Sequence, residues 1–203
     1  MDGAAGDQAP RPYLAREARR AMLLDHARAI VALDGASALS MRTLAARAGI
    51  AHGSVQHAFG SKAELVRSLL EHEARAVLER VWQRIRPGAS VTLGDLVALA
   101  LDAYADDLER HPEQHAALAA LERAARASPA LRSALVAERD ALRVAVGDLL
   151  AGWALRRGEA PPDDDGAIVE AVLVAIDGLT QWWLATGFDA RRPTVVRMLA
   201  GGF

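Results

Sequence analysis

The sequence contains no cysteine, a single lysine and few aromatic residues, which make up 4% of its 203 residues. Without cysteine the chain can form neither a disulfide framework nor a thiolate metal site. Because aromatic residues are rare, the core must be mainly aliphatic, and alanine and leucine, which are common here, are strong helix formers. β-Branched runs flanked by turns are scarce. The composition therefore predicts an all-α fold.

Long apolar segments are also few. The N-terminus has no apolar run long enough for a signal peptide. Residues 167–186 approach the length of a membrane span, but Glu170 and Asp177 would each cost about 2.5–3.5 kcal/mol at the centre of a bilayer. We therefore expect this segment to be a buried helix of a cytoplasmic protein that has no membrane partner.

Positive charge is unevenly distributed, although the net charge is only −2. Residues 11–62 hold eight basic and three acidic residues, whereas residues 83–203 hold 13 basic and 17 acidic residues. A basic N-terminal lobe on an acidic body is typical of a protein that binds a polyanion at one end. Chance clustering in an arginine-rich chain is the alternative.

Helical periodicity and turn residues divide the chain into four parts. Ser61 and Glu64 have the spacing of a capping box at the start of one long helix, and Pro87 and Gly88 would end that helix. The expected parts are a flexible tail (1–13), a three-helix domain (14–60), a connecting helix (61–86) and a larger helical domain (87–203).

Residues 40–58 have the pattern of two short helices joined by a tight turn. Ser40 is a suitable N-cap for the first of them, and Gly49 suits a turn residue with positive φ. The expected apolar centre consists of Leu44, Ile50, Val55 and Phe59. This pattern predicts a helix-turn-helix, in which the second helix enters the major groove of double-stranded DNA.

The second short helix is expected to present polar side chains outward. Gln56 can pair with adenine through two hydrogen bonds, and Arg42 can reach guanine or phosphate. Side chains at helix starts, such as Ser54 and Lys62, can hold phosphates. A solvated surface turn is the alternative, because helix-turn-helix patterns are short. The candidate DNA-binding residues are Ser40, Arg42, Thr43, His52, Gly53, Ser54, Gln56, His57 and Lys62.

The segment MRTLAARAGIAHGSVQHAFGSKAELVRSLL, residues 41–70, resembles the DNA-binding segment of the TetR family of bacterial repressors. The shared motif is Met-Arg-x-Leu-Ala-x-x-Ala-Gly, then a short helix ending in Phe-Gly, then Ser-Lys-x-Glu-Leu. The resemblance spans roughly residues 16–75, and the remainder matches only in length and helix order. It implies a variable helical C-terminal domain that forms a homodimer and encloses a small-molecule pocket.

The chain departs from the family pattern at three positions. Many members have tyrosines where this chain has Gln56 and His57, so the aromatic phosphate contact cannot be transferred. Ala51 stands where a serine usually caps the second short helix, which we call the reading helix because it would contact the bases. The missing cap lowers the stability of this helix by about 1 kcal/mol. We expect an altered operator sequence or weaker phosphate contacts.

The helix expected over residues 166–186 is apolar on nearly every face, so every face should be buried. One face could pack on the domain's own core and another on a second subunit; a core helix of a monomer is the alternative. The resemblance places the dimer interface on this helix and the last one. The candidate interface residues are Ala171, Val174, Ala175, Gly178, Trp182, Val195, Val196 and Leu199.

Aromatic and polar residues of the C-terminal domain are candidates for a ligand pocket, although large aromatic residues more often belong to the core. The candidate ligand-binding residues are Tyr104, His115, Trp153, Ile176, Thr180 and Trp183. His111 and His115 are four residues apart, but Pro112 interrupts the helical register that a shared metal would need. We expect no metal and no cofactor.

Together these patterns predict a non-enzymatic, TetR-like, homodimeric transcriptional regulator, and the resemblance favours a repressor. It would bind a pseudo-palindromic double-stranded DNA operator and be released by a small apolar or aromatic effector. One alternative is an architectural or cell-cycle DNA-binding protein with no effector. The other is an all-α enzyme with a coincidental helix-turn-helix, which the lack of a nucleophile, phosphate-loop or zinc motif disfavours.

Overall fold

The computed structural model describes residues 12–85, 91–160 and 164–201, which are helical apart from short connections and include no strand. The all-α fold predicted from composition is confirmed. The elements are α1 (Pro12–Asp34), the 3₁₀ helix η1 (Ala36–Ala38), α2 (Met41–Ala48), α3 (His52–Phe59), α4 (Lys62–Arg84), α5 (Leu93–Arg110), α6 (Pro112–Arg126), α7 (Arg132–Arg157), α8 (Asp165–Thr186) and α9 (Arg192–Ala200).

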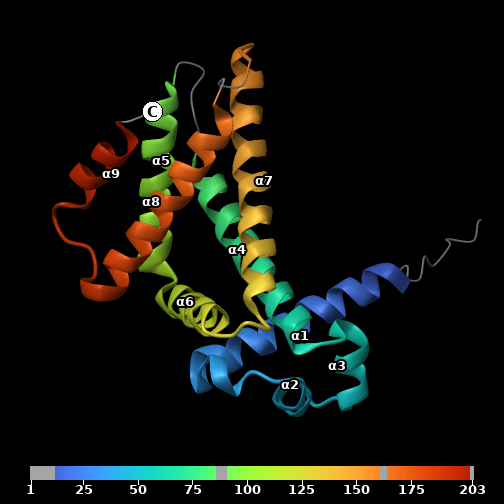
Figure 1. The fold of residues 1–203 in the computed structure, drawn as a ribbon. Helices are drawn as coiled ribbons and strands as arrows, with labels where there is room; N and C mark the ends of the chain where they lie inside the picture. Colours follow the sequence, from blue (N-terminus) through green and yellow to red (C-terminus); the bar gives the residue numbers. More distant parts are fainter. Residues whose placement is uncertain (1–11, 86–90, 161–163, 202–203) are drawn as a thin grey trace, which may run out of the picture.

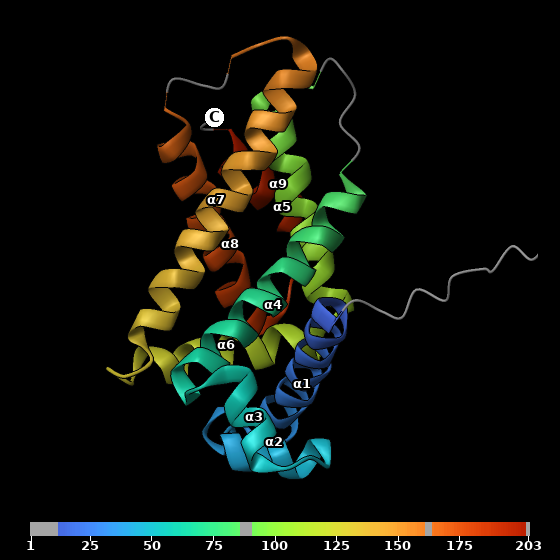
Figure 2. The same cartoon turned by 90° about the vertical axis from the view of Figure 1, so that its right-hand side faces the viewer.

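The helices form a small head and a larger body (Figure 1). The head consists of α1, α2 and α3, and α4 runs from it into the body, where it packs against α5 and α7. α8 packs against both α5 and α7, and α9 lies along α5 at the edge of the body. α6 crosses below the body and packs against α1, so α4 and α6 both join the head to the body (Figures 1 and 2).

Two clusters of buried apolar residues form the core. The larger fills the body between α4, α5, α7, α8 and α9 and includes Leu101 and Leu173. The second underlies the head around Leu44, and Leu121 of α6 and Ala134 of α7 belong to it as well. The core of the head is therefore completed by helices that lie far along the chain.

The first helix is longer than expected. α1 begins at Pro12, so the last two residues of the expected tail are helical. Proline is tolerated in the first turn because its missing N–H would have no partner there. Residues 1–11 and the predicted break at Pro87 and Gly88 lie outside the described residues.

The start of α4 confirms half of the predicted capping box. The Ser61 hydroxyl accepts a hydrogen bond from the backbone N–H of Glu64 (3.1 Å). The capping box would also have the Glu64 carboxylate accept a hydrogen bond from the backbone N–H of Ser61. This carboxylate instead accepts hydrogen bonds from Arg20 and Arg67. Charge-assisted hydrogen bonds to guanidinium groups are stronger than one to a neutral backbone amide, which explains the difference.

α8 is the one helix in the described parts of the chain that is long and apolar enough to cross a membrane, with a mean hydropathy of 1.4. Only 28% of its most apolar window is buried inside the chain. Its acidic residues Glu170 and Asp177 both pair with Arg139 of α7, at 3.0 Å each. Much of this helix is therefore open in the single chain, and the expected burial of every face would need a second subunit on the open side.

Candidate DNA-binding surface and ligand cavity

The start of α2 is fixed by a complete capping box. The Ser40 hydroxyl accepts from the N–H of Thr43 (3.1 Å), and the N–H of Ser40 donates to the Thr43 hydroxyl (2.9 Å). That hydroxyl also donates to the carbonyl oxygen of Ala38 (2.7 Å), so both side chains are engaged in holding the turn. Arg42 stands exposed on the first turn beside them.

The turn between α2 and α3 depends on glycine. Gly49 has φ 66° and ψ 30°, a left-handed conformation that side-chain-bearing residues adopt only at a cost. α3 then begins at His52, and Ala51 offers no side-chain cap. The first N–H groups of α3 therefore have no side-chain acceptor, and a phosphate oxygen could accept from them.

α3 has one buried and one exposed face, as predicted. Val55 is 0% and Phe59 3% exposed, because both pack into the core of the head. The remaining predicted contacts of this helix are exposed, namely His52, Gly53, Ser54, Gln56 and His57. The Gln56 side chain donates to the carbonyl oxygen of Gly60, so it must leave that bond to read a base.

Arg20 of α1 holds the reading helix in place, a role that sequence reasoning missed. Its guanidinium donates to the carbonyl oxygen of Ala58 (2.7 Å) and to the Glu64 carboxylate (3.2 Å). It also lies 4.8 Å from the ring centroid of Phe59. One side chain thus joins α1, the end of α3 and the start of α4.

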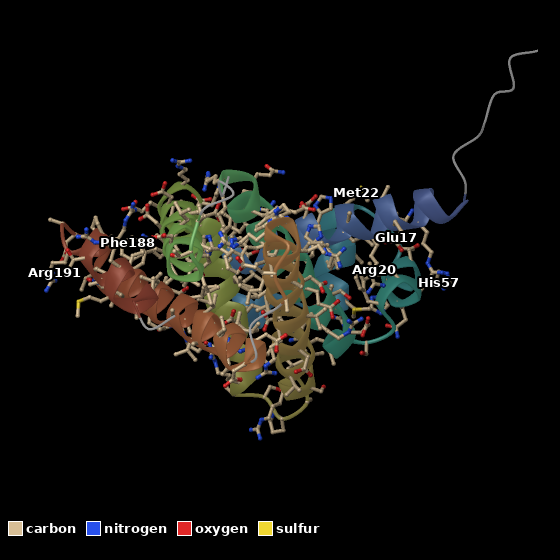
Figure 3. All side chains as sticks on the ribbon, turned by 90° about the horizontal axis from the view of Figure 1, so that it is seen from above. Glu17, Arg20, Met22, His57, Phe188 and Arg191 are labelled. Atoms are coloured by element: carbon tan, nitrogen blue, oxygen red, sulfur yellow. The ribbon has the colours of Figure 1, made fainter. Side chains whose placement is uncertain are left out.

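A groove between α1 and α3 adds positive charge beside the exposed face of α3. Arg16, Arg19 and Arg20 line it from α1, opposite Ser54 and His57 of α3. Figure 3 shows Arg20 and His57 near one another in the head, at the opposite end of the molecule from Phe188 and Arg191. Lys62 is exposed at the start of α4, so cationic groups flank α3 on two helices.

The body contains a cavity of about 650 Å³ between α4, α5, α6, α7 and α8. Four of the six predicted ligand residues line it, namely Tyr104, His115, Ile176 and Thr180. The Tyr104 hydroxyl and the Thr180 hydroxyl share a hydrogen bond of 2.6 Å, and Tyr104 meets the His115 ring edge-on at 5.6 Å between centroids. Most lining residues are aliphatic, and six charged side chains of α6, α7 and α8 also line the cavity.

The other two predicted ligand residues do not line the cavity. Trp153 is buried in the body core, 7% exposed, and its indole N–H has no hydrogen-bond partner among the described residues. Trp183 of α8 is half-buried and is not among the residues that line the cavity. The lining residues that sequence reasoning missed include Trp82, Glu122 and Glu138, which sit on amphipathic helices without a distinguishing motif.

Asp107 of α5 is fully buried and has polar partners on two other helices. Arg80 of α4 donates two hydrogen bonds to it at 2.8 Å each, and His115 of α6 lies 3.0 Å away. Burial alone would raise the pKa of Asp107, but these hydrogen bonds outweigh it and hold the pKa below its ordinary value. Burial also lowers the pKa of His115, against the effect of Asp107.

Hydrogen bonds continue from this cluster to the head. Arg80 also donates to the Gln114 side-chain oxygen (3.0 Å), and the Gln114 amide donates to Glu73 (2.5 Å). The buried Glu73 carboxylate pairs with Arg28 of α1 at 3.3 Å. We call the series His115, Asp107, Arg80, Gln114, Glu73 and Arg28 the polar chain. It connects a residue of the cavity wall with the first helix of the head.

His111 and His115 do not form a metal site in the described structure. His111 lies 3.7 Å and His115 3.0 Å from the same Asp107 carboxylate. Across the described residues no group of three or more histidine and acidic side chains could hold a metal ion. The two histidines are instead neighbours of one ion-pair cluster.

The predicted interface residues of α8 and α9 fall into three groups. Ala171, Val174, Gly178 and Leu199 are exposed, with Val174 59% exposed. Val195 and Trp182 are half-buried, and Trp182 meets Phe188 edge-on. Ala175 and Val196 are buried in the chain's own core, 7% and 3% exposed. We expected Ala175 and Val196 on the outer face of α8 and α9, but each faces inward, toward the body core.

Comparison with known proteins identifies the head. Residues 23–69 match the family model described as bacterial regulatory proteins, tetR family. This span begins within α1 and ends in α4, so it contains the helix-turn-helix and its supporting helices. No curated protein matches the chain.

Solved structures match almost the whole chain. The multidrug binding protein EbrR, in complex with ethidium, is 24% identical, with 91% of this chain and 97% of that chain covered and a TM-score of 0.68. A TetR-family transcriptional regulator from Streptomyces coelicolor is 22% identical, with coverages of 90% and 96% and a TM-score of 0.62. A transcriptional regulator from Rhodococcus sp. Rha1 is 20% identical, with coverages of 90% and 94% and a TM-score of 0.64.

The two kinds of match support different statements. At these identities the solved structures show a shared fold for head and body together. The family model matches the residues that build the reading head. Residues 23–69 therefore match the helix-turn-helix region of the tetR family of bacterial regulatory proteins, and head and body together have the fold of a TetR-family regulator.

Proposed function

We propose that the protein is a cytoplasmic homodimeric repressor that binds a pseudo-palindromic operator and is released by a small molecule with an apolar or aromatic body. No catalytic activity is part of the proposal. The proposal rests on one observation. α4 and α6 line a ligand-sized cavity in the body and also pack against the head, which carries the exposed reading helix.

The cavity supports the effector. Its volume of about 650 Å³ lies within the roughly 300–1,000 Å³ of small-molecule sites, which combine apolar walls with a few polar groups. The related protein EbrR is described in complexes with ethidium and with imidazole. This chain has the same fold, and its cavity would hold the effector between α4, α5, α6, α7 and α8.

The polar chain supports coupling between effector and operator. A ligand that displaced His115 would change the support of Asp107 and Arg80, and therefore the position of α4 relative to α1. A typical coupling free energy of about 1–3 kcal/mol corresponds to a change in DNA affinity of roughly 5–150-fold. Small shifts of α4 would suffice, because α4 begins directly after the reading helix.

The test of DNA recognition starts from a pool of random duplexes. Selection with the full chain should enrich an inverted repeat whose half-sites are about one helical turn apart, or a multiple of it, since a twofold dimer presents its reading helices about 34–36 Å apart or a multiple of that distance. Gln56→Ala should weaken binding to the enriched site by about 1–3 kcal/mol, roughly 5–150-fold, if Gln56 reads a base.

Fluorescence anisotropy across a salt series measures the affinity of the unchanged protein and of Gln56→Ala for the enriched site. Gln83→Ala is the matched control, because Gln83 is exposed on α4 at the far end from the head and should leave affinity unchanged. Failure to enrich any sequence would reject the operator. Equal binding by Gln56→Ala and the unchanged protein would remove Gln56 as a base reader.

The open face of α8 and α9 supports a homodimer. Val174, Met198 and Leu199 are 59%, 75% and 39% exposed, an apolar surface that a second copy would cover. Val174→Arg should convert the dimer to monomers in analytical ultracentrifugation and lower operator affinity with it. Val136→Arg is the control, because Val136 is equally exposed at 57% but lies on α7. A dimer that survives Val174→Arg would place the interface elsewhere.

A further inference from the structure

Three carboxylates from three helices lie in the wall of the body cavity. They are Glu122 of α6, Glu138 of α7 and Asp177 of α8. Two of them have guanidinium partners, since Arg126 donates to Glu122 and Arg139 donates to Asp177, at 3.0 Å each. The side chains of Arg126 and Asp177 are 61% and 63% exposed. Both pairs therefore lie toward the solvent edge of the cavity, where the negative charge is already compensated.

Glu138 has no such partner. It is only 7% exposed, and among the described residues no donor hydrogen-bonds to its carboxylate and no basic group lies within ion-pair distance. Burial first, and then the nearby Glu122, raise the pKa of Glu138 to about 7. This carboxyl group therefore gives up its proton near neutral pH, whereas an exposed glutamate has lost it well below.

The other groups around Glu138 do not offset its charge. Of the described lining residues of α4 and α5, only Tyr104 can titrate. Burial lowers the pKa of His115 and raises that of Tyr104, so neither carries a charge between pH 7 and pH 8. The charged groups of the wall besides Glu138 come from α6, α7 and α8 and are Glu122, Arg123, Arg126, Arg139 and Asp177. Burial acts in the same direction as the two carboxylates, and together they outweigh the guanidinium groups.

α6 joins this carboxylate cluster to the head. Glu122 follows Leu121 in the sequence, and Leu121 is buried in the core of the head together with Ala117 and Ala125. The same helix therefore lines the cavity and packs against α1. A movement of α6 away from Glu138 would displace the support of the head.

We propose that Glu138 is a proton switch: with its proton the cavity stays narrow and the head binds the operator, and without it repulsion from Glu122 and Asp177 moves α6 outward. This inference rests on the proposed function, because a ligand that widened the cavity would move α6 in the same direction. The sign follows from linkage. The operator-binding arrangement holds the proton more tightly, so it is favoured below pH 7 and loses this advantage as the pH rises through 7.

Fluorescence anisotropy with the enriched operator at pH 6 and pH 8, at constant ionic strength, measures the linkage. From pH 6 to pH 8 the operator affinity of the unchanged chain should fall by about threefold or more beyond the fall in Glu138→Gln, since one linked proton allows up to about tenfold per pH unit. Glu138→Asp keeps a titratable group and should restore the larger fall. The head histidines, such as His52 and His57, are present in every variant, so their titration cancels in the comparison.

Asp148→Asn is the matched control, because Asp148 is exposed on the same helix and its variant should follow the unchanged chain. Equal pH profiles for the unchanged chain and Glu138→Gln would overturn the switch and leave the proposed function standing. A smaller fall in the unchanged chain than in Glu138→Gln would overturn it as well. Absence of sequence-dependent binding at either pH would instead reject the proposed function, and with it the action of the switch on DNA.

A second measurement follows the cavity without DNA. The chain has no cysteine, so spin labels can be attached at Ala116→Cys of α6 and Ala185→Cys of α8, both exposed positions. Double electron–electron resonance on labelled chains diluted with unlabelled ones should show the two helices further apart at pH 8 than at pH 6. Glu138→Gln should remove this change. A distance that is the same at both pH values would overturn the switch, whatever the DNA measurements show.

Discussion

Asp107→Ala is expected to lower the free energy of unfolding by about 3–5 kcal/mol, the range observed when one partner of a buried ion pair is removed. The carboxylate is 0% exposed and accepts two hydrogen bonds from Arg80 at 2.8 Å. Arg84 approaches it at 3.4 Å and His115 at 3.0 Å. Without Asp107 these partly buried donors lose their acceptor, and the guanidinium groups keep a positive charge that no other carboxylate of the described residues neutralises.

Urea unfolding at a fixed protein concentration measures this loss, since the stability of the proposed homodimer would depend on concentration. Asp102→Ala is the matched control: Asp102 is on the same helix, 50% exposed, and pairs with Arg192 at 3.2 Å, so its removal should cost less than about 1 kcal/mol. Similar losses in the two variants would show that Asp107 is no more important than a surface carboxylate.

Glu138→Gln is expected to stabilise the ligand-free protein at pH 8 by about 1–3 kcal/mol and to have little effect at pH 5. The pKa of Glu138 is raised to about 7 from an ordinary 4.5. As the pH rises from 4.5 to 7, the unfolded chain gives up this proton before the folded chain does, so the unchanged protein loses stability. Above pH 7 the full loss remains, and glutamine avoids it because it carries no charge.

Urea unfolding at pH 5 and at pH 8 measures the difference between Glu138→Gln and the unchanged protein. Asp140→Asn is the control, since Asp140 lies two residues further along α7 with its side chain 62% exposed and should give the same small effect at both pH values. A stabilisation by Glu138→Gln that is equal at pH 5 and pH 8 would mean that packing, and not the buried charge, is responsible.

The reading head could be predicted in detail because its determinants are local. The cap at Ser40, the positive φ of Gly49 and the inward faces of Val55 and Phe59 all follow from residues close together in the sequence. Arg20 could not be assigned in this way. Its partners Ala58 and Glu64 are 38 and 44 residues distant, and only tertiary packing brings them together.

The body was predicted less well, for two physical reasons. α8 is apolar on almost every face, so periodicity could not distinguish inward Ala175 from outward Val174. Composition also does not reveal which residues line a cavity, and Trp153 and Trp183 were therefore expected there although neither lines it. Glu138 carried no sequence signal, because a single glutamate on an amphipathic helix usually faces water.

The contribution of α6 to the core of the head limits how these proteins can be recombined. Ala117, Leu121 and Ala125 of α6 pack with the residues beneath α1 and α2. A chimaera that joined the first 60 residues of a relative to this body would meet an α6 surface shaped for different side chains. Exchanging operator specificity between relatives therefore requires either transplanting only the exposed residues of α3, or moving the matching face of α6 together with the head.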